Sequence, residues 1–220
     1  MLLLNSQVPD RLAFISSVVL LTISLIFCFR KGTSFYMRTL PYFCFLNVLS
    51  DYIVWLFPRT LEVSFLLYTT IELLYFSFLI ICLIRSARIK RFIKILDAVY
   101  LLYVVYYLIR HGQIPPFRYP VIIESLILIT ASSIYFTEII SKPLILHLTA
   151  ATEFWLVTGI LFYFCMQIPI LTLSSYYDGI GDRSLSIAIY SANGYTLFFT
   201  YILFIAAILC TRTKTYPRTY

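Results

Sequence analysis

Among the carboxyl and amide side chains inside the long apolar stretches of this chain, five stand out: Asp51, Glu72, Glu124, Gln167 and Asn193. A carboxylate in hydrocarbon costs about 3 kcal/mol unless it faces protein or water, so such residues are candidates for binding an ion or a ligand. One alternative is that they hold helices together by contacts of about 0.6 kcal/mol each. In that case the carboxyls can be neutral and hydrogen-bonded to a Tyr or an Asn, with no ligand involved.

Helical spacing gathers these polar residues into stripes. Asn47 and Asp51 are four residues apart, so they share one helix face. Two further stripes are Tyr68, Glu72, Tyr75 and, later, Tyr190, Asn193, Leu197, Tyr201. We expect the three stripes to face one another around one polar pocket that opens to the outside. The predicted ligand-binding residues are Asp51, Glu72, Asn193, Asn47, Glu124, Tyr68, Tyr75 and Gln167.

The elements that must position these residues are seven apolar stretches. Each has about 18 to 26 residues, enough to cross a hydrocarbon core of about 30 Å at 1.5 Å per residue. Their bounds are Leu12–Phe29, Leu40–Phe57, Val63–Ile84, Phe92–Ile109, Val121–Ile140, Phe154–Leu173 and Leu185–Cys210. The segment 174–182, with two glycines and two acids, reads as an exposed turn. The chain 1–220 is therefore predicted to be one all-α domain, a polytopic bundle of seven transmembrane helices.

Basic residues alternate between the connections. Of the 17 Lys and Arg residues, 12 fall after the odd-numbered stretches: Arg30, Lys31, Arg38, Arg85, Arg88, Lys90, Arg91, Lys94, Lys142, Arg212, Lys214 and Arg218. The positive-inside rule then puts the N-terminus outside and the C-terminus in the cytoplasm, as a multi-pass protein of the inner (plasma) membrane.

Composition agrees with a membrane protein and excludes other classes. The chain is 61% hydrophobic and 12% charged, with a mean hydropathy of +0.90. The net charge of +7 is explained by topology, so we expect no nucleic-acid partner. The two histidines, His111 and His147, fall on opposite sides, and the five cysteines lie in apolar stretches. We therefore expect no metal site, no disulfide framework and no cofactor.

Five of the basic residues crowd into one cytoplasmic segment: Arg85, Arg88, Lys90, Arg91 and Lys94. Each basic residue near an anionic bilayer surface gains about 1 kcal/mol. We expect this segment to contact lipid headgroups or a partner. Nearby acids, Asp97, Glu138 and Glu153, are expected to form ion pairs at the inner interface.

Four strings resemble recurring segments of a group of small, uncharacterised bacterial seven-pass membrane proteins. They run over residues 68–76, 124–128, 154–163 and 193–197, and include Glu72, Glu124, Phe154-Trp155, Gly159 and Asn193. Members of that group are often encoded near two-component sensor kinases. The resemblance implies a sensory or accessory role and a membrane sensor kinase as a possible partner, but no activity.

Three functions follow from these observations. The first is a non-enzymatic sensor or accessory subunit whose outward pocket binds a small ligand, a cation or a lipid headgroup. The second is a small-solute or proton-coupled transporter, which would need a polar path to the cytoplasm. The third is an intramembrane lipid enzyme with two carboxyls as acid and base. The sequence shows no nucleophile with an adjacent base, so the enzyme ranks last and no catalytic residue is assigned.

Overall fold

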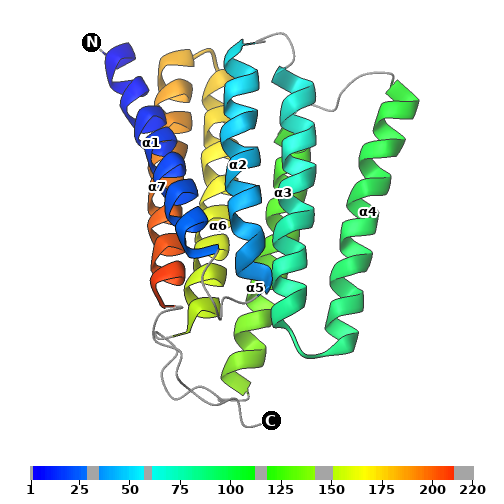
Figure 1. The fold of residues 1–220 in the computed structure, drawn as a ribbon. Helices are drawn as coiled ribbons and strands as arrows, with labels where there is room; N and C mark the ends of the chain where they lie inside the picture. The colour runs from blue at the N-terminus through cyan, green and yellow to red at the C-terminus, as the bar shows by residue number, and fades with distance from the viewer. Residues whose placement is uncertain (1, 29–34, 57–60, 112–117, 142–150, 211–220) are drawn as a thin grey trace.

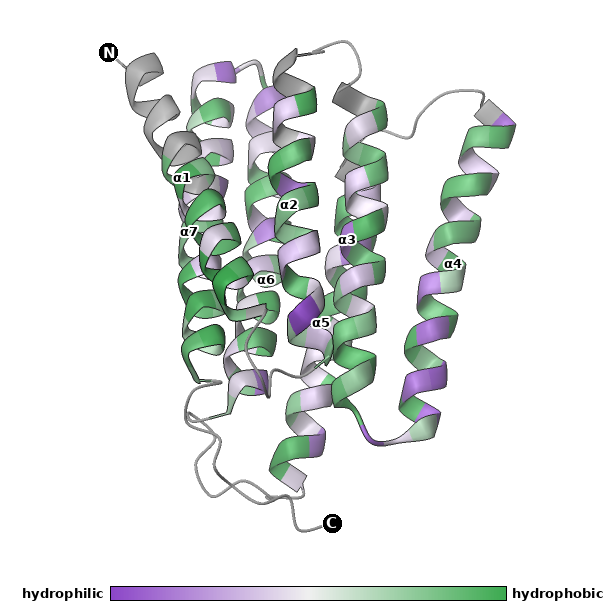
Figure 2. Cartoon of the chain, viewed as in Figure 1, coloured by the Kyte–Doolittle hydropathy of each residue, from purple (hydrophilic) through white to green (hydrophobic). Residues whose placement is uncertain are grey.

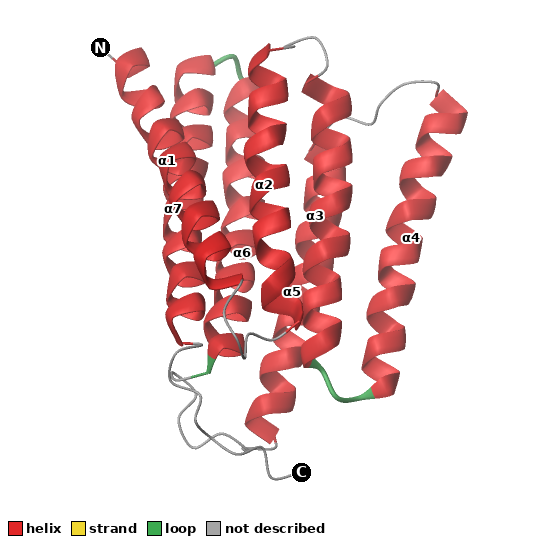
Figure 3. Ribbon diagram, in the orientation of Figure 1, coloured by secondary structure: helices red, strands yellow, loops and turns green. Residues whose placement is uncertain are grey.

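Each of the seven apolar stretches forms one helix. The structure is a computed structural model that describes residues 2–28, 35–56, 61–111, 118–141 and 151–210. The helices of these segments are α1 (Leu2–Cys28), α2 (Phe35–Leu56), α3 (Leu61–Leu83), α4 (Ala87–His111), α5 (Arg118–Ser141), α6 (Thr152–Gly179) and α7 (Arg183–Cys210). They run alternately up and down (Figures 1 and 3). The prediction of an all-α bundle is confirmed.

Two helices extend well beyond the apolar stretches that predicted them. The first begins at Leu2, ten residues before the expected span. The sixth ends at Gly179, so the turn expected over 174–182 is wrong for its first six residues. Here Ser174 Oγ and Ser175 Oγ both donate to the Leu171 carbonyl, which lets polar residues prolong the helix. The turn itself is short, with Gly181 at φ +84°.

Helix neighbours define a ring. The pairs α1–α2, α2–α3, α3–α5, α5–α6, α6–α7 and α7–α1 all pack together, which closes a ring of six helices. The contact between α6 and α7 is the most extensive. The remaining helix, α4, packs on α3 and α5 from outside and stands apart at the edge of the bundle (Figure 1). Residues far apart in the sequence, on α2 and α7, can therefore meet across the interior.

The outer surface is apolar, as expected of helices that face lipid. Large apolar side chains are strongly exposed, for example Phe35 (71%), Leu102 (67%) and Ile109 (79%). Figure 2 shows this apolar colouring along the outside of the helices. Within the described residues, five helices, α3 to α7, are long and apolar enough to cross a membrane. The chain thus has the architecture of a multi-pass membrane protein.

A layer of four phenylalanines fills the middle of the ring. Phe76 of α3 lies 4.9 Å from Phe43 of α2, 5.9 Å from Phe164 of α6 and 6.0 Å from Phe204 of α7, between ring centroids. All four are buried, with at most 5% of their surface exposed. These spacings are typical of favourable aromatic pairs. The layer fixes the separation of four helices just where polar residues also meet.

Candidate functional site

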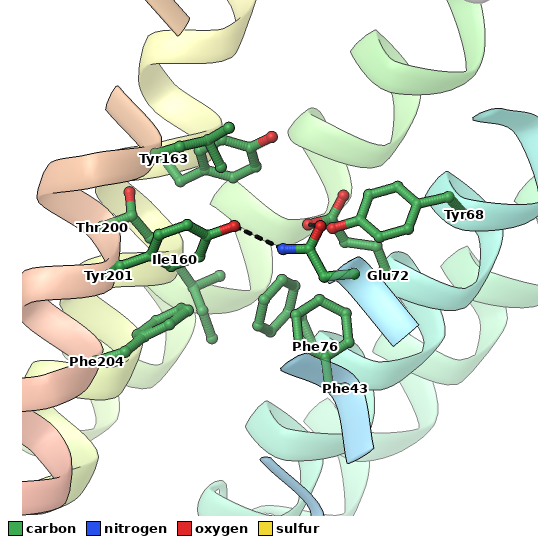
Figure 4. A pocket seen from close by; sticks show the side chains of 11 residues that line it. Phe43, Tyr68, Glu72, Phe76, Ile160, Tyr163, Thr200, Tyr201 and Phe204 are labelled. Atoms are coloured by element: carbon green, nitrogen blue, oxygen red, sulfur yellow. Dashed lines mark hydrogen bonds between the residues drawn. The ribbon is translucent and has the colours of Figure 1, made fainter. Parts of the chain in front are cut away.

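Polar side chains from four helices converge in the ring immediately beside the phenylalanine layer. Asn47 comes from α2, Glu72 from α3, Tyr163 from α6 and Tyr201 from α7, and all four border one small cavity (Figure 4). Asn47, Glu72 and Tyr201 each stand three or four residues from the phenylalanine of the same helix, and Tyr163 directly precedes Phe164. The polar side chains therefore form a level of the bundle that lies next to the phenylalanine layer. The polar level lies on the side away from the α3–α4 turn, the outer side in the predicted topology.

Their polar atoms bind one another. Asn47 Nδ2 donates to the Tyr201 hydroxyl at 2.6 Å, which joins α2 to α7 across 154 residues of sequence. Tyr68 OH donates to Glu72 Oε1 at 3.2 Å within α3. Gln167 donates to the Tyr163 hydroxyl one turn away on α6. The result is a polar cluster of Asn47, Tyr68, Glu72, Glu124, Tyr163, Gln167 and Tyr201, called the central cluster below.

The cavity beside the central cluster is small. The space open to the centre of a water molecule is about 10 Å³, close to the least that holds one water. Besides the polar groups, its wall includes Phe43, Phe76 and Phe204. An organic ligand does not fit in this conformation, whereas a water molecule, a proton or a bare ion does.

Glu124 is the residue of the central cluster that departs from ordinary packing. It is fully buried on α5, and neither carboxylate oxygen has a hydrogen-bond partner among the described residues. Its electrostatic neighbour is Glu72, a second acid on α3. Although Glu124 lies in the second turn of α5, near the end of the helix, the structure encloses it completely. Buried polar groups without partners are rare in native structures.

The other predicted ligand-binding residues are spread more widely. Tyr75 stacks on Phe43 with centroids 4.4 Å apart and belongs to the phenylalanine layer rather than to the cavity wall. Asn193 is half-buried on α7, and its Oδ1 has no partner among the described residues. Asp51 lies in α2, but its side chain is outside the described residues. The three stripes therefore meet at Asn47, Glu72 and Tyr201.

Three polar residues of the cavity wall are absent from the predicted ligand-binding set, although one of them, Tyr201, belongs to a predicted stripe. Tyr163 and Thr200 border the cavity from α6 and α7, but aromatic and hydroxyl residues are common in membrane helices and carry little signal by themselves. The spacing of Tyr163 and Gln167, one helical turn, is the clue that could have paired them. Nothing in the sequence shows that α6 lies opposite α2.

The basic segment lies at the far end of the bundle. Arg85 precedes α4, and Arg88, Lys90, Arg91 and Lys94 occupy its first two turns, where Figure 2 shows a hydrophilic patch. All are exposed except Lys90, which is half-buried. These cations stand at the N-terminus of α4, the positive end of the helix dipole, which repels them. The first turn of α4 contains no acid that would offset this repulsion. An anionic group nearby would relieve this repulsion.

The acids near that end, which were expected to form ion pairs, accept hydrogen bonds from neutral donors. Asp97 accepts a hydrogen bond from Ser77 Oγ at 2.9 Å. Glu138 accepts from the backbone N–H of Arg85 at 3.2 and 3.3 Å. Glu153 accepts from the Tyr36 hydroxyl, which joins α6 to α2. Each of the three carboxylates therefore accepts a hydrogen bond from a neutral donor on a different segment of the chain.

Comparison with known proteins adds no family to this description. The chain matches none of the protein-family models, curated proteins or solved structures with which it was compared. Its chemistry is therefore argued from the geometry of the central cluster. Within the described residues, no group of three or more His, Cys, Asp or Glu side chains could hold a metal ion.

Proposed function

We propose that this chain is a non-enzymatic membrane sensor or accessory subunit that responds to a small ion or a proton at the central cluster. The observation that carries the proposal is the burial of two interacting acids, Glu72 and Glu124, the first of which lines a cavity of water size. Carboxyls within a membrane bundle are expensive and are by default functional candidates. We take the bundle to be seven-pass, with the N-terminus outside and the C-terminus inside the plasma membrane, as the basic residues predict.

The phenylalanine layer favours a sensor over a transporter. Phe43, Phe76, Phe164 and Phe204 pack between the central cluster and the end of the bundle that carries the basic segment. A transported solute would have to pass through this packed layer. A sensor needs only a shift of helices between two states with different affinity for the ligand.

The geometry gives little support to an enzyme. A lipid hydrolase would need an acid and a base reaching one substrate bond, and a slot that admits the substrate. The cavity has room for about one water. The hydroxyl of Tyr201 is already occupied by Asn47, and that of Tyr163 by Gln167. A lipid chain has no place beside them.

The signal would leave through the basic segment. Glu72 sits on α3, whose far end connects directly to α4, where Arg88, Lys90, Arg91 and Lys94 begin the helix. A movement of α3 at Glu72 is therefore transmitted over a single helix to that turn. The proposed receiver is an anionic lipid surface or a membrane partner, and the resemblance noted above suggests a sensor kinase.

The test compares conformation and transport in one preparation. Full-length protein in lipid vesicles is exposed to steps of pH, Na⁺ or K⁺ while the fluorescence of its two tryptophans and the internal ion concentration are both recorded. A sensor gives a fluorescence change without ion flux. The change is lost in Glu72→Gln and kept in Glu138→Gln, an acid outside the central cluster. Flux that depends on Glu72 overturns the sensor in favour of a transporter. No response of either kind overturns both.

A further inference from the structure

Glu124 differs from every other buried polar residue of the central cluster. Asn47 is paired with Tyr201 and Gln167 with Tyr163. Away from the cluster, the buried Asp97 is paired with Ser77. Glu124 is fully buried, yet both of its oxygens lack a partner among the described residues. A buried polar side chain that only joins helices is expected to have a hydrogen-bond partner in the protein. The Glu124 carboxyl group has none among the described residues, so we expect it to bind a proton or an ion.

The charges around Glu124 show what is missing. The neighbouring charged group is the acid Glu72, only 5% exposed on the facing helix α3. Among the described residues, the Lys and Arg side chains stand near helix ends and are exposed or half-exposed. Two carboxylates that interact in a low-dielectric interior repel strongly, and a single proton removes one of the two charges.

We propose that Glu72 and Glu124 hold one proton between their carboxyl groups, so that the pair is a proton-binding site at the centre of the ring. The inference rests on the proposed function and names its ligand. A proton needs no coordination shell, whereas a metal ion needs several oxygen ligands. The described part of the chain contains no cluster of three metal-ligating side chains, and the cavity beside the central cluster has room for about one water.

Tyrosine hydroxyls from three helices lie near the pair: Tyr68 on α3 binds Glu72, and Tyr100 on α4 and Tyr163 on α6 lie near Glu124. Tyr100 and Tyr163 both interact electrostatically with Glu124. The Tyr163 hydroxyl accepts from Gln167, which leaves its own proton free to donate. Thr69 and Thr70 lie near the Tyr100 hydroxyl, but it makes no hydrogen bond of acceptable geometry among the described residues.

These hydroxyls give the proton a structural consequence. With the proton bound, the acid pair carries one negative charge, and the hydroxyls of Tyr100 and Tyr163 donate no hydrogen bond to Glu124. When the proton leaves, the second carboxylate becomes the strongest acceptor near both hydroxyls. Each then turns toward it, and α4 and α6 are drawn toward α5. The proton thus couples the central cluster to the helix that carries the basic segment.

Infrared spectroscopy of the full chain in lipid nanodiscs tests the proposal directly. A protonated carboxyl group gives a carbonyl stretch above the amide I band that shifts when H₂O is replaced by D₂O. We expect such a band in the wild-type protein. It should move when all glutamates carry ¹³C in the side-chain carboxyl, which assigns it to glutamate without any mutation.

Variants then locate the band. Glu124→Gln and Glu72→Gln keep the shape of the side chain, and each should abolish or shift the band. Asp97→Asn is the matched control, since Asp97 is buried but paired with Ser77, and should leave the glutamate band unchanged. Absence of a ¹³C-sensitive band in wild-type protein at every pH overturns the proposal, as does a band that both Gln variants retain. If the variants do not fold, the labelled wild-type spectrum alone decides.

One result would separate this inference from the proposed function. A fluorescence response to Na⁺ or K⁺ together with no glutamate band would mean that the acids hold a metal cation. The sensor would stand and the shared proton would be wrong. A glutamate band together with no fluorescence response would mean that the acids share a proton and that the proposed sensor function is wrong.

Discussion

Gly159 of α6 lies directly against the ring of Phe204 on α7. A Cβ atom placed on Gly159 would come within 2.8 Å of Phe204 Cε1 and 3.4 Å of Leu203 Cβ. Phe204 is 2% exposed and packs on Phe76, so its ring has little free space to move into. Small residues are the usual means by which membrane helices approach closely. This glycine sets the distance between the two helices with the most extensive contact.

Gly159→Ala should therefore destabilise the bundle by about 1–3 kcal/mol through overpacking. Thermal unfolding of the detergent-solubilised protein measures the change. Gly179→Ala is the matched control, because nothing lies within 4 Å of a Cβ at that position, and its midpoint should not fall. Phe204→Leu in the Gly159→Ala background should recover part of the loss. A Gly159→Ala protein as stable as wild type contradicts the close approach.

The hydrogen bond between Asn47 and Tyr201 gives a second prediction. Tyr201→Phe leaves the Asn47 amide without this partner in a buried position, at a cost of about 1–2 kcal/mol. A double-mutant cycle with Asn47→Leu should give a coupling energy of about 0.6 kcal/mol, and at most about 1.7. Tyr195→Phe, on the exposed face of α7, serves as the control and should be neutral. Additive effects of the two substitutions would show that the bond contributes nothing.

The helices are predicted well from the sequence because each one contains a long run of apolar residues. Seven apolar stretches gave seven helices, and spacing by helical turns correctly placed Asn47, Glu72 and Tyr201 on inward faces. Helix ends were less predictable. Ser174 and Ser175 look like turn residues, yet their hydroxyls bond to the Leu171 carbonyl and continue α6. Polar residues outside the hydrocarbon can either form a turn or continue a helix, and local hydrogen bonds determine which of the two occurs.

The site was predictable only in part, because it depends on which helices are neighbours. Glu124 meets Glu72 since α5 follows α3 around the ring while α4 is left outside. Nothing in the apolar pattern of α4 distinguishes it from the helices of the ring. Tyr163 became visible only when α6 was found to face α2 and α7. Packing order is set by the shapes of many side chains together, such as Gly159 against Phe204.

The attachment of α4 supplies a third prediction. Ser77 Oγ donates to Asp97 Oδ1 at 2.9 Å, between α3 and α4, and both residues are buried. Ser77→Ala removes the donor and leaves the carboxyl group without it, so α4 should separate from α3 more often. We expect faster amide hydrogen exchange along α4 and unchanged exchange in α7. Ser133→Ala, on an exposed face of α5, is the control. If the amides of α4 are equally protected from exchange in Ser77→Ala and Ser133→Ala, apolar packing alone holds α4 against the bundle.

The basic segment supplies the last prediction. Arg88, Lys90, Arg91 and Lys94 stand at the positive end of the α4 dipole with no acid in the first turn, so each gains from an anionic headgroup. A gain of about 1 kcal/mol per residue corresponds to about fivefold in binding. Replacing all four by Gln should lower the affinity for phosphatidylglycerol at least about tenfold.

Native mass spectrometry of protein released from mixed phosphatidylglycerol and phosphatidylcholine vesicles counts the retained lipids. The control replaces Arg110 and Arg183, exposed at the opposite end of the bundle, and should retain phosphatidylglycerol as the wild type does. A third variant that replaces only Arg88 and Arg91 removes as many charges as the control, so net charge alone cannot explain a loss of lipid that is confined to it. Equal retention by the wild type and the fourfold variant would mean that the segment does not bind lipid. Its cations would then be left for a protein partner to neutralise.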